Sequence, residues 1–342
     1  MARIRRRRGA KPREHGLPEA ATTQADAPAL GAAHVVCTVA EGAYFNGVAA
    51  LINSLVAAGF RGDVVVAYRG ALPDWVGALA PDAGTDTRAV APGVRLRTIP
   101  LPGAWHLGNL RPQLIVDIFA RTRAELVFYF DTDIVLTGPW DAFARWAANG
   151  IVAALDVADS FMPANHAFRH EWRRLAATKG YSCAETTGYF NSGCVGIGRA
   201  HADFAAVWRD LMLALEVEGA DMRTLKDSSG KVEFSRMDQD MLNIAIMAAG
   251  APISALGYES MGLYPRANQM MAHAMFYKKP WCRPYILDAL RGIPPGQSHL
   301  AYWRHVDGPI QPFSPLSRRL RRVEVAIARF IGLLHVRDSR DL

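Results

Sequence analysis

Short apolar runs alternate with helical patterns along the first half of the chain. Two runs rich in β-branched residues, 34–40 and 63–68, and a shorter one at 94–100 predict buried strands. Apolar residues at helical spacing predict helices over 44–58 and 112–121. Buried strands that alternate with helices are typical of a parallel sheet, so we expect an α/β fold.

A further apolar run, 126–130, leads directly into Asp131 and Asp133. Ligands of open α/β sheets bind beyond the carboxyl ends of the strands, which is where this pair lies. Two carboxylates there suit a hard divalent cation, which prefers oxygen ligands and can share its other positions with phosphates. The structural alternative is that the two acids only end the strand or cap the next element. We expect the metal site, because the pair follows a buried strand and not a solvated helix face.

The second half of the chain has a more mixed pattern. It predicts strands over 151–155 and 194–198 and helices over 202–217 and 239–249. Residues 156–187 show no regular pattern, and we expect this segment to carry specificity, as loops over a fixed scaffold do.

A last helical pattern spans residues 316–334 and places apolar residues on one face and arginines elsewhere. The apolar residues are Leu316, Leu320, Val323, Ile327, Phe330, Ile331 and Leu334. An apolar face with a basic remainder is found in helices that lie on membranes, but also in helices that pack on the protein's own core. We expect packing on the core, which is the commoner arrangement.

Charge divides the chain into three parts. The formal net charge of +7 comes largely from basic residues near the two ends. We expect a flexible basic arm over residues 1–32, one domain over 33–315, and a basic amphipathic helix and tail over 316–342. No helix-turn-helix, zinc-finger or RNA-binding signature accompanies the charge, so we expect no nucleic-acid partner. The terminal charge favours either contact with anionic lipid or a solubilising tail.

Several other classes of protein are disfavoured by composition. The chain has 342 residues, half of them hydrophobic, which is enough for a substantial core. Its four cysteines include no Cys-x-x-Cys pair, which argues against a thiolate metal site or a disulfide scaffold. No signal peptide is evident, and the apolar stretches fall short of the ~18 residues that a membrane span requires. We expect a cytoplasmic protein that can lie against the inner face of the cell membrane.

Five short motifs follow one another in an informative order. They are an opening strand with Thr38 and Tyr44, the strand with Asp131 and Asp133, Phe190-Asn191-Ser192-Gly193, Asp238-Gln239-Asp240 and His305-Val306-Asp307-Gly308. In this order the chain resembles glycosyltransferase family 8 and its relatives of the GT-A fold, over about residues 34–312. The resemblance implies a Rossmann-like, mixed and mostly parallel sheet flanked by helices.

The resemblance also implies roles for single positions. A divalent metal, Mn²⁺ or Mg²⁺, would be bound by Asp131, Asp133 and His305. Asp238 and Gln239 would contact the donor sugar near its reacting carbon and stabilise positive charge there. The donor nucleotide and its sugar would be held by Thr38, Glu41, Tyr44, Arg111, Asp131, Thr132, Asn191, Ser192, Gly308 and Gln311.

Each of these roles has a structural alternative. By propensity alone, Asp238 would cap the helix that begins there. Asn191-Ser192-Gly193 would form a turn before the strand at 194–198, and His305 would be an ordinary loop histidine.

One position departs from the family pattern, which closes with His-x-x-Gly-x-x-Lys-Pro. Gln311 stands where the lysine that neutralises the pyrophosphate is expected. A neutral amide can donate a hydrogen bond, but a charge-assisted bond is about twice as strong. Cations that could replace the lysine are Arg304, Arg266, Lys278 and Lys279.

The activity implied by the resemblance is transfer of a sugar from a nucleoside-diphosphate sugar, usually a uridine diphosphate sugar. The acceptor would be a glycan or a lipid-linked saccharide, and the anomeric configuration would be retained. One alternative is a degenerate binding protein of the same fold, which Gln311 favours. A second is a sugar nucleotidyltransferase, which needs a Gly-rich phosphate loop with a basic residue after the first strand; residues 40–44 lack one.

Overall fold

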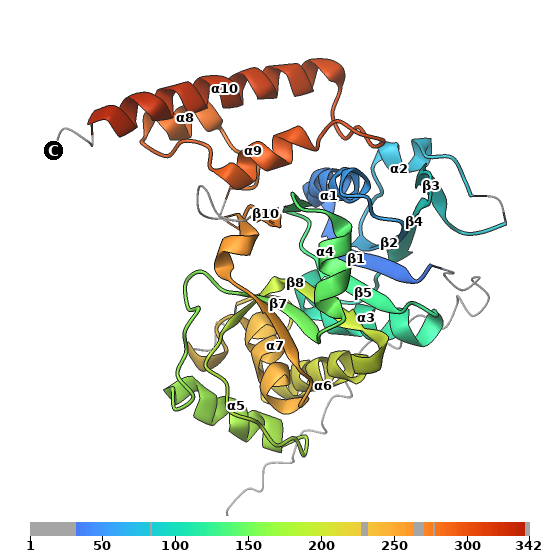
Figure 1. Ribbon diagram of the computed structural model, residues 1–342, viewed down its shortest axis with the longest axis vertical. Helices are drawn as coiled ribbons and strands as arrows, with labels where there is room; N and C mark the ends of the chain where they lie inside the picture. The colour runs from blue at the N-terminus through green and yellow to red at the C-terminus, as the bar shows by residue number, and fades with distance from the viewer. Residues whose placement is uncertain (1–31, 83, 227–231, 263–269, 276–277, 339–342) are drawn as a thin grey trace, which may run out of the picture.

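The computed structural model describes residues 32–82, 84–226, 232–262, 270–275 and 278–338 (Figure 1), with only the backbone described for 335–338. The predicted basic arm lies outside the described residues except for Ala32. Arg266 and the end of the C-terminal tail, residues 339–342, also lie outside them.

A mixed eight-stranded sheet forms the centre of the molecule, in the order β3-β4-β2-β1-β5-β8-β7-β9. Strands β4, β2, β1 and β5 run parallel to one another, and β7 runs parallel to β9. Strand β3 is antiparallel to β4, and β8 is antiparallel to both β5 and β7. The strands are β1 His34–Glu41, β2 Gly62–Arg69, β3 Arg88–Ala91, β4 Val94–Pro100, β5 Leu126–Phe130, β7 Ile151–Leu155, β8 Phe190–Gly198 and β9 Ile253–Leu256. The predicted mixed, mostly parallel sheet is confirmed.

Helices cover both faces of this sheet (Figure 1). Successive side chains of a strand point to opposite faces, so Tyr129 of β5 packs with one set of helices and Phe128 with the other. This is why a central strand is apolar at every position. The first set is α3 Arg111–Arg121, α5 Ala167–Ala177, α6 Asp203–Val217 and α7 Met237–Ala248, and the second is α1 Phe45–Ala57, α2 Asp74–Ala78 and α4 Trp140–Ala147.

A smaller sheet and three helices form a third layer beyond α1. β6 Ile134–Leu136 follows the acidic pair and pairs antiparallel with β10 Met271–His273. Side chains from this sheet and from the C-terminal helices share a separate apolar core. The helices are α8 Tyr285–Leu290, α9 Gln297–Arg304 and α10 Pro315–Asp338.

Strand β8 begins four residues earlier than predicted, because Phe190–Gly193 belongs to the strand and does not form a turn. Its pairing with β7 shifts register at this point: Ala153 lies opposite Val195, but the next residue of β7 lies opposite Asn191. Asn243 of α7 holds the irregular backbone, accepting a hydrogen bond from the N–H of Phe190 and donating to its carbonyl, at 2.8 Å each. A bulge of this kind re-aims side chains, here those of Asn191 and Ser192.

The C-terminal helix differs from the expectation in the face that it buries. Of the seven apolar residues predicted to pack on the core, all but Ile331 are exposed. The face that packs carries Val325 and Ala328, which are buried, together with Gly332. Small residues there allow close approach to the turn after α8, since a Cβ at Gly332 would lie 2.4 Å from Pro294.

No helix within the described residues has the length and apolar character that crossing a membrane requires.

A buried acid fastens α7 to the sheet. Asp240 accepts a hydrogen bond of 2.7 Å from the hydroxyl of Tyr189 and one of 2.8 Å from the backbone N–H of Arg236. Burial raises the pKa of Asp240 to about 7 from an ordinary value of 3.8, because few charges offset the loss of water. Between these pH values the folded protein holds a proton that the unfolded chain has released.

Protonation of Asp240 therefore stabilises the fold at low pH, and this contribution falls as pH rises from 3.8 to about 7. Asp240→Asn keeps both hydrogen bonds, since the amide oxygen can accept from Arg236 and the amide N–H can donate to Tyr189. We expect the variant to gain stability relative to wild type across this window, by up to ~1.4 kcal/mol per pH unit. Urea unfolding at a series of pH values measures this, and parallel profiles for the two proteins would contradict it.

Candidate active site

Two acids lie where β5 ends at the carboxyl edge of the sheet. Asp131 is fixed by its backbone N–H, which donates to the carbonyl of Gly193 on β8 at 2.8 Å, and by the hydroxyl of Tyr129, which donates to its carboxylate at 3.0 Å. Helix α1 approaches this loop closely, because a Cβ at Gly47 would lie 2.2 Å from the carbonyl oxygen of Thr132. The acidic pair is thus held between the central strands and α1.

His273 joins the two acids in a group that could hold a metal ion. Its Nε2 lies 3.3 Å from Asp133 Oδ1 and 3.7 Å from Asp131 Oδ2. One ligand atom from each of the three residues lies within 4.8 Å of the others. Two carboxylate oxygens and one imidazole nitrogen fit Mn²⁺ or Mg²⁺. Nε2 is the ring nitrogen that faces the acids, whereas Nδ1 is buried without a hydrogen-bond partner among the described residues.

The pairing of β6 with β10 brings His273 to this position. In this pairing His273 lies opposite Ile134, and Ile134 directly follows Asp133 in the sequence. The backbone N–H of Ala274 also donates to the carbonyl of Asp133 at 2.9 Å. The histidine is therefore placed by tertiary pairing, from a segment 140 residues farther along the chain than Asp133.

Lys279 supplies a cation beside the same acids. Its Nζ lies 2.6 Å from Asp133 Oδ2. Burial by itself raises the pKa of Asp133, but His273 and Lys279 outweigh burial and hold that pKa well below its usual range. In Lys279, burial lowers the pKa and the carboxylate of Asp133 raises it further, so the net pKa lies above its usual value. The lysine is therefore charged at neutral pH and available to an anion.

Arg111, at the start of α3, bridges two acids from different elements. Its guanidinium lies 2.6 Å from Asp131 Oδ1 and 2.5 Å from Asp238 Oδ2, and it donates to the hydroxyl of Ser192 at 2.8 Å. Burial raises the pKa of Asp238, and Arg111 opposes that rise without cancelling it. The arginine thus ties β5, β8 and α7 together at the site.

Asp156, which was not among the predicted site residues, connects the remaining polar groups. Its carboxylate accepts from the amide of Asn191 at 2.9 Å and from that of Gln239 at 3.2 Å. The side-chain oxygen of Gln239 also accepts from the backbone N–H of Ser192 at 3.2 Å. Arg236 lies 3.7 Å from Asp156. A cluster of amide and carboxylate groups of this kind can bind sugar hydroxyls. The feature of the sequence that could have identified Asp156 is its position directly after β7, at the carboxyl end of a strand.

Of the residues predicted for the nucleobase, Thr38 and Glu41 belong to β1 and Tyr44 follows it, and they differ in accessibility. Thr38 is fully buried, and its hydroxyl has no partner among the described residues. Glu41 is exposed, and Tyr44 is 44% exposed with its ring edge-on to Trp281 at a centroid distance of 5.5 Å. Thr132 is buried between the two acids. Of these four, Glu41 and Tyr44 can be reached by a ligand without rearrangement.

The structure does not bring His305, Gly308 and Gln311 to the acids. Asn53 of α1 holds their loop, donating to the carbonyl of His305 at 2.9 Å, and a Cβ at Gly308 would lie 2.6 Å from its side chain. Gln311 is exposed and accepts from Arg318 of α10 at 3.2 Å. Within the described residues, His273 occupies the place expected for His305.

The spacing assigned to His305, Gln311 and Pro312 also occurs at His273, Lys279 and Pro280. There the lysine is present, and Phe276, outside the described residues, replaces the glycine of the pattern. Of the four cations considered in place of the lysine, Lys279 is therefore the one that pairs with an acid of the site among the described residues.

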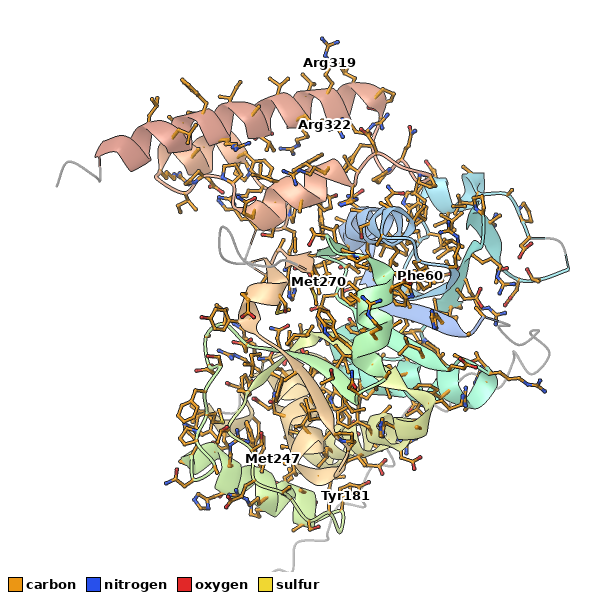
Figure 2. The ribbon with its side chains drawn as sticks, viewed as in Figure 1. Phe60, Tyr181, Met247, Met270, Arg319 and Arg322 are labelled. Carbon is orange, nitrogen blue, oxygen red and sulfur yellow. The ribbon has the colours of Figure 1, made fainter. Side chains whose placement is uncertain are left out.

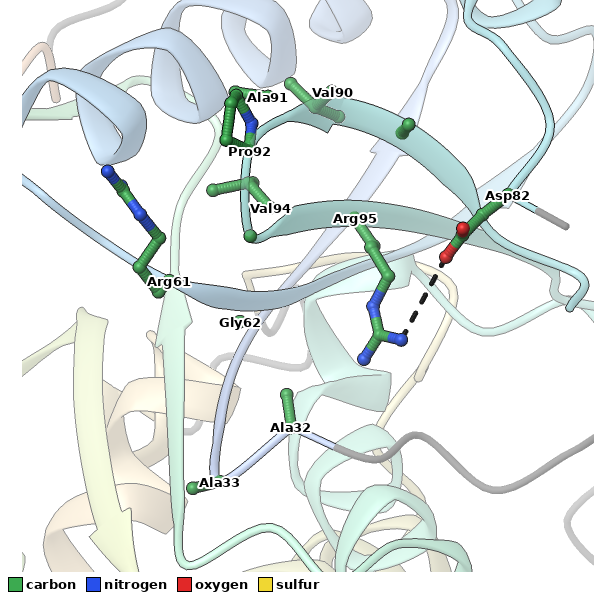
Figure 3. Close-up of a pocket in the computed structure, with 12 residues that line it drawn as sticks. Ala32, Ala33, Arg61, Gly62, Asp82, Val90, Ala91, Pro92, Val94 and Arg95 are labelled. Carbon is green, nitrogen blue, oxygen red and sulfur yellow. Dashed lines mark ion pairs between the residues drawn. The ribbon is translucent and has the colours of Figure 1, made fainter.

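A separate groove of about 780 Å³ lies at the other edge of the sheet (Figure 3). Its lining includes Gly62 and Val94, which begin β2 and β4, and Ala33, which precedes β1. Arg95 and Asp82 face each other across it at 4.0 Å. The acidic site lies beyond the carboxyl ends of the strands, so this groove is not part of it.

Comparison with known proteins gives structural matches alone. No family model and no curated protein matches the sequence. A solved structure of the WbbM bifunctional glycosyltransferase has a TM-score of 0.52 and 15% identity, covering 86% of this chain and 52% of that protein. GlyE of Streptococcus pneumoniae TIGR4 has a TM-score of 0.48 and 13% identity, covering 81% and 60%. An active-site mutant of LgtC has a TM-score of 0.49 and 14% identity, covering 84% and 99%.

These matches concern the fold. This chain spans about half the length of WbbM, and sequence identity is low throughout. The mixed, mostly parallel sheet flanked by helices agrees with the expectation from the sequence, and the acidic pair lies at the carboxyl edge of the sheet. The chain has the GT-A fold and is similar in structure to glycosyltransferases.

Proposed function

We propose that the protein is a metal-dependent glycosyltransferase that uses a nucleoside-diphosphate sugar, with uridine as the base. The observation that carries the proposal is the group of Asp131, Asp133 and His273, with Lys279 beside it at the carboxyl edge of the sheet. A divalent cation and a basic side chain each stabilise a departing diphosphate, and this site can provide both.

Asp131, Asp133 and His273 would hold the metal, which when bound neutralises the diphosphate and stabilises its departure. Lys279 would then leave Asp133 and bind a phosphate oxygen through a charge-assisted hydrogen bond. The exposed ring of Tyr44, next to Trp281, offers an aromatic surface for the base. This part of the proposal explains why a lysine lies against a buried metal ligand.

The sugar would lie near the polar cluster of Asp156, Asn191 and Gln239. Asp238 is held by Arg111, and we assign it and Gln239 to binding the sugar and stabilising positive charge on it. The acceptor hydroxyl, from a glycan or a lipid-linked saccharide, would attack the anomeric carbon on the face from which the diphosphate leaves. The anomeric configuration would then be retained.

The proposal of a degenerate binding protein loses its main support. It depended on the absence of a lysine at Gln311, and Lys279 supplies that charge from another segment. For a nucleotidyltransferase, the chain after β1 offers Glu41 and a short turn over Gly42–Tyr44 without a basic residue. Sugar transfer therefore remains the function that the site supports best.

Two histidines form a matched pair for testing the metal site. We expect His273→Ala to weaken Mn²⁺-dependent binding of uridine diphosphate by more than the about 10- to 100-fold that loss of an outer-shell partner costs. His305→Ala should bind as wild type does. Calorimetric titration with a panel of nucleoside diphosphates, with and without Mn²⁺, measures both. Normal binding by the His273 variant, or binding lost in the His305 variant alone, would contradict this assignment.

Neighbouring lysines allow a similar test of the diphosphate contact. Lys279→Gln should weaken binding of uridine diphosphate by about 10- to 100-fold, the value of a hydrogen bond to a charged group, and leave uridine binding unchanged. Binding of Mn²⁺ alone should not weaken, because Lys279 no longer competes for Asp133. Lys278→Gln is the control, since Lys278 pairs with Asp288 at 2.7 Å, away from the metal group. Equal nucleotide affinities in the two variants would exclude the role given to Lys279.

A further inference from the structure

Helix α10 carries an apolar stripe that faces away from the protein. Its members are spaced by four and three residues in turn, so they lie on one side of the helix. They are Leu316, Leu320, Val323, Ile327, Phe330 and Leu334, and their exposed fractions lie between 44% and 67%. A stripe of this length and exposure is uncommon on a protein surface that only meets water.

No element among the described residues covers this stripe. The face of α10 that packs towards α8 carries Val325, Ala328 and Gly332. Residues two positions apart in an α-helix point in nearly opposite directions, because the helix has 3.6 residues per turn. Val323 and Ile327 therefore lie on the far side from Val325. Figure 1 shows α10 as the outermost helix, with α8 and α9 between it and the rest of the molecule.

Positive charge is carried by the same helix, with Arg319 beside the stripe and the other arginines farther round the helix. Helix α10 has five arginines and one acid among residues whose side chains are described: Arg318, Arg319, Arg321, Arg322, Arg329 and Glu324. Glu324 is occupied by Arg321 at 2.7 Å and by the N–H of Tyr285. Arg319 and Arg329 are exposed and have no acidic partner among the described residues. Figure 2 shows Arg319 pointing away from the protein and Arg322 on the side of α9.

A basic groove lies between α9 and α10. It has a volume of about 260 Å³ and is lined by Arg304, Arg322, Arg329, Leu300 and Trp303. No acid lines it, although Arg322 also pairs with Asp307 at 2.5 Å. Guanidinium groups around an apolar floor suit a phosphate that is attached to an apolar body.

Charge decides between the occupants of this surface. A second copy would place identical arginine-rich flanks near one another, which costs free energy. A bilayer with anionic headgroups offers acyl chains to the stripe and phosphates to the arginines. The combination of both features on one helix favours the bilayer.

We propose that α10 binds the surface of an anionic membrane, with its apolar stripe in the interface and the arginines of α10 and the adjacent groove against lipid phosphates. This proposal does not depend on the function proposed above, since none of its residues touches the acidic site. The protein would bind to one leaflet and not cross it.

The test is co-sedimentation of the full chain with vesicles of phosphatidylcholine alone or of equal parts phosphatidylcholine and phosphatidylglycerol. Ile327→Ser with Phe330→Ser removes the centre of the stripe, and Ala326→Ser is the control at an exposed position beside it. Arg319→Gln with Arg329→Gln removes unpaired charge. Each set is repeated in a chain with Arg5, Arg6, Arg7 and Arg8 changed to Gln, so that binding through the N-terminal segment is separated.

We expect wild type and the control to bind the mixed vesicles far better than phosphatidylcholine alone. The stripe variant should bind about tenfold more weakly or worse in both backgrounds, with its melting temperature and nucleotide binding unchanged. The arginine variant should lose about fivefold for each arginine.

Equal vesicle binding by the stripe variant and the control in the arginine-substituted background would overturn the proposal. So would sedimentation of wild type as a dimer and of the stripe variant as a monomer without a change in vesicle binding, because a second copy would then cover the stripe. Failure of nucleotide binding in every protein would count against the transferase alone.

Discussion

Buried carboxylates at the carboxyl edge of β5 are the constraint around which the surrounding elements are arranged. Asp133 and Asp238 are almost fully buried, and a buried charge is tolerated only when it is paired. Their partners come from α3, from β10 and from the segment before α8: they are Arg111, His273 and Lys279. Each of these elements is therefore fastened to the central sheet by the acids that form the site.

Strands that are apolar throughout could be located from the sequence because their burial depends on their own residues. β5 and β7 have the predicted bounds for this reason. Near the start of β8, Asn191 and Ser192 are polar and look like a turn. They enter the sheet because Asp156 accepts from Asn191, and Gln239 and Arg111 hydrogen-bond Ser192. Helix α10 shows the same limit. Its strongest apolar face was expected to pack, but small residues on the other face give the closer contact with α8.

The candidate site could be predicted where its residues lie close together in the sequence, as Asp131 and Asp133 do. The third residue of the site could not be predicted, because two histidines fit parts of the family pattern. His273 is followed by Lys279 and Pro280, and His305 is followed by Gly308 and Pro312. The choice of His273 is made by the antiparallel pairing of β10 with β6, an interaction between segments that sequence spacing does not encode.

The ion pair between Lys279 and Asp133 has a consequence for how the site is filled. The ammonium group compensates the carboxylate, so each charge of this pair has a partner within the protein. On the proposed function, an arriving complex of metal and nucleotide brings both a cation and an anion. The cation would be held by the carboxylate and the anion by the lysine. Binding would then be an exchange of ionic partners, in which each charge of the pair gains a new one.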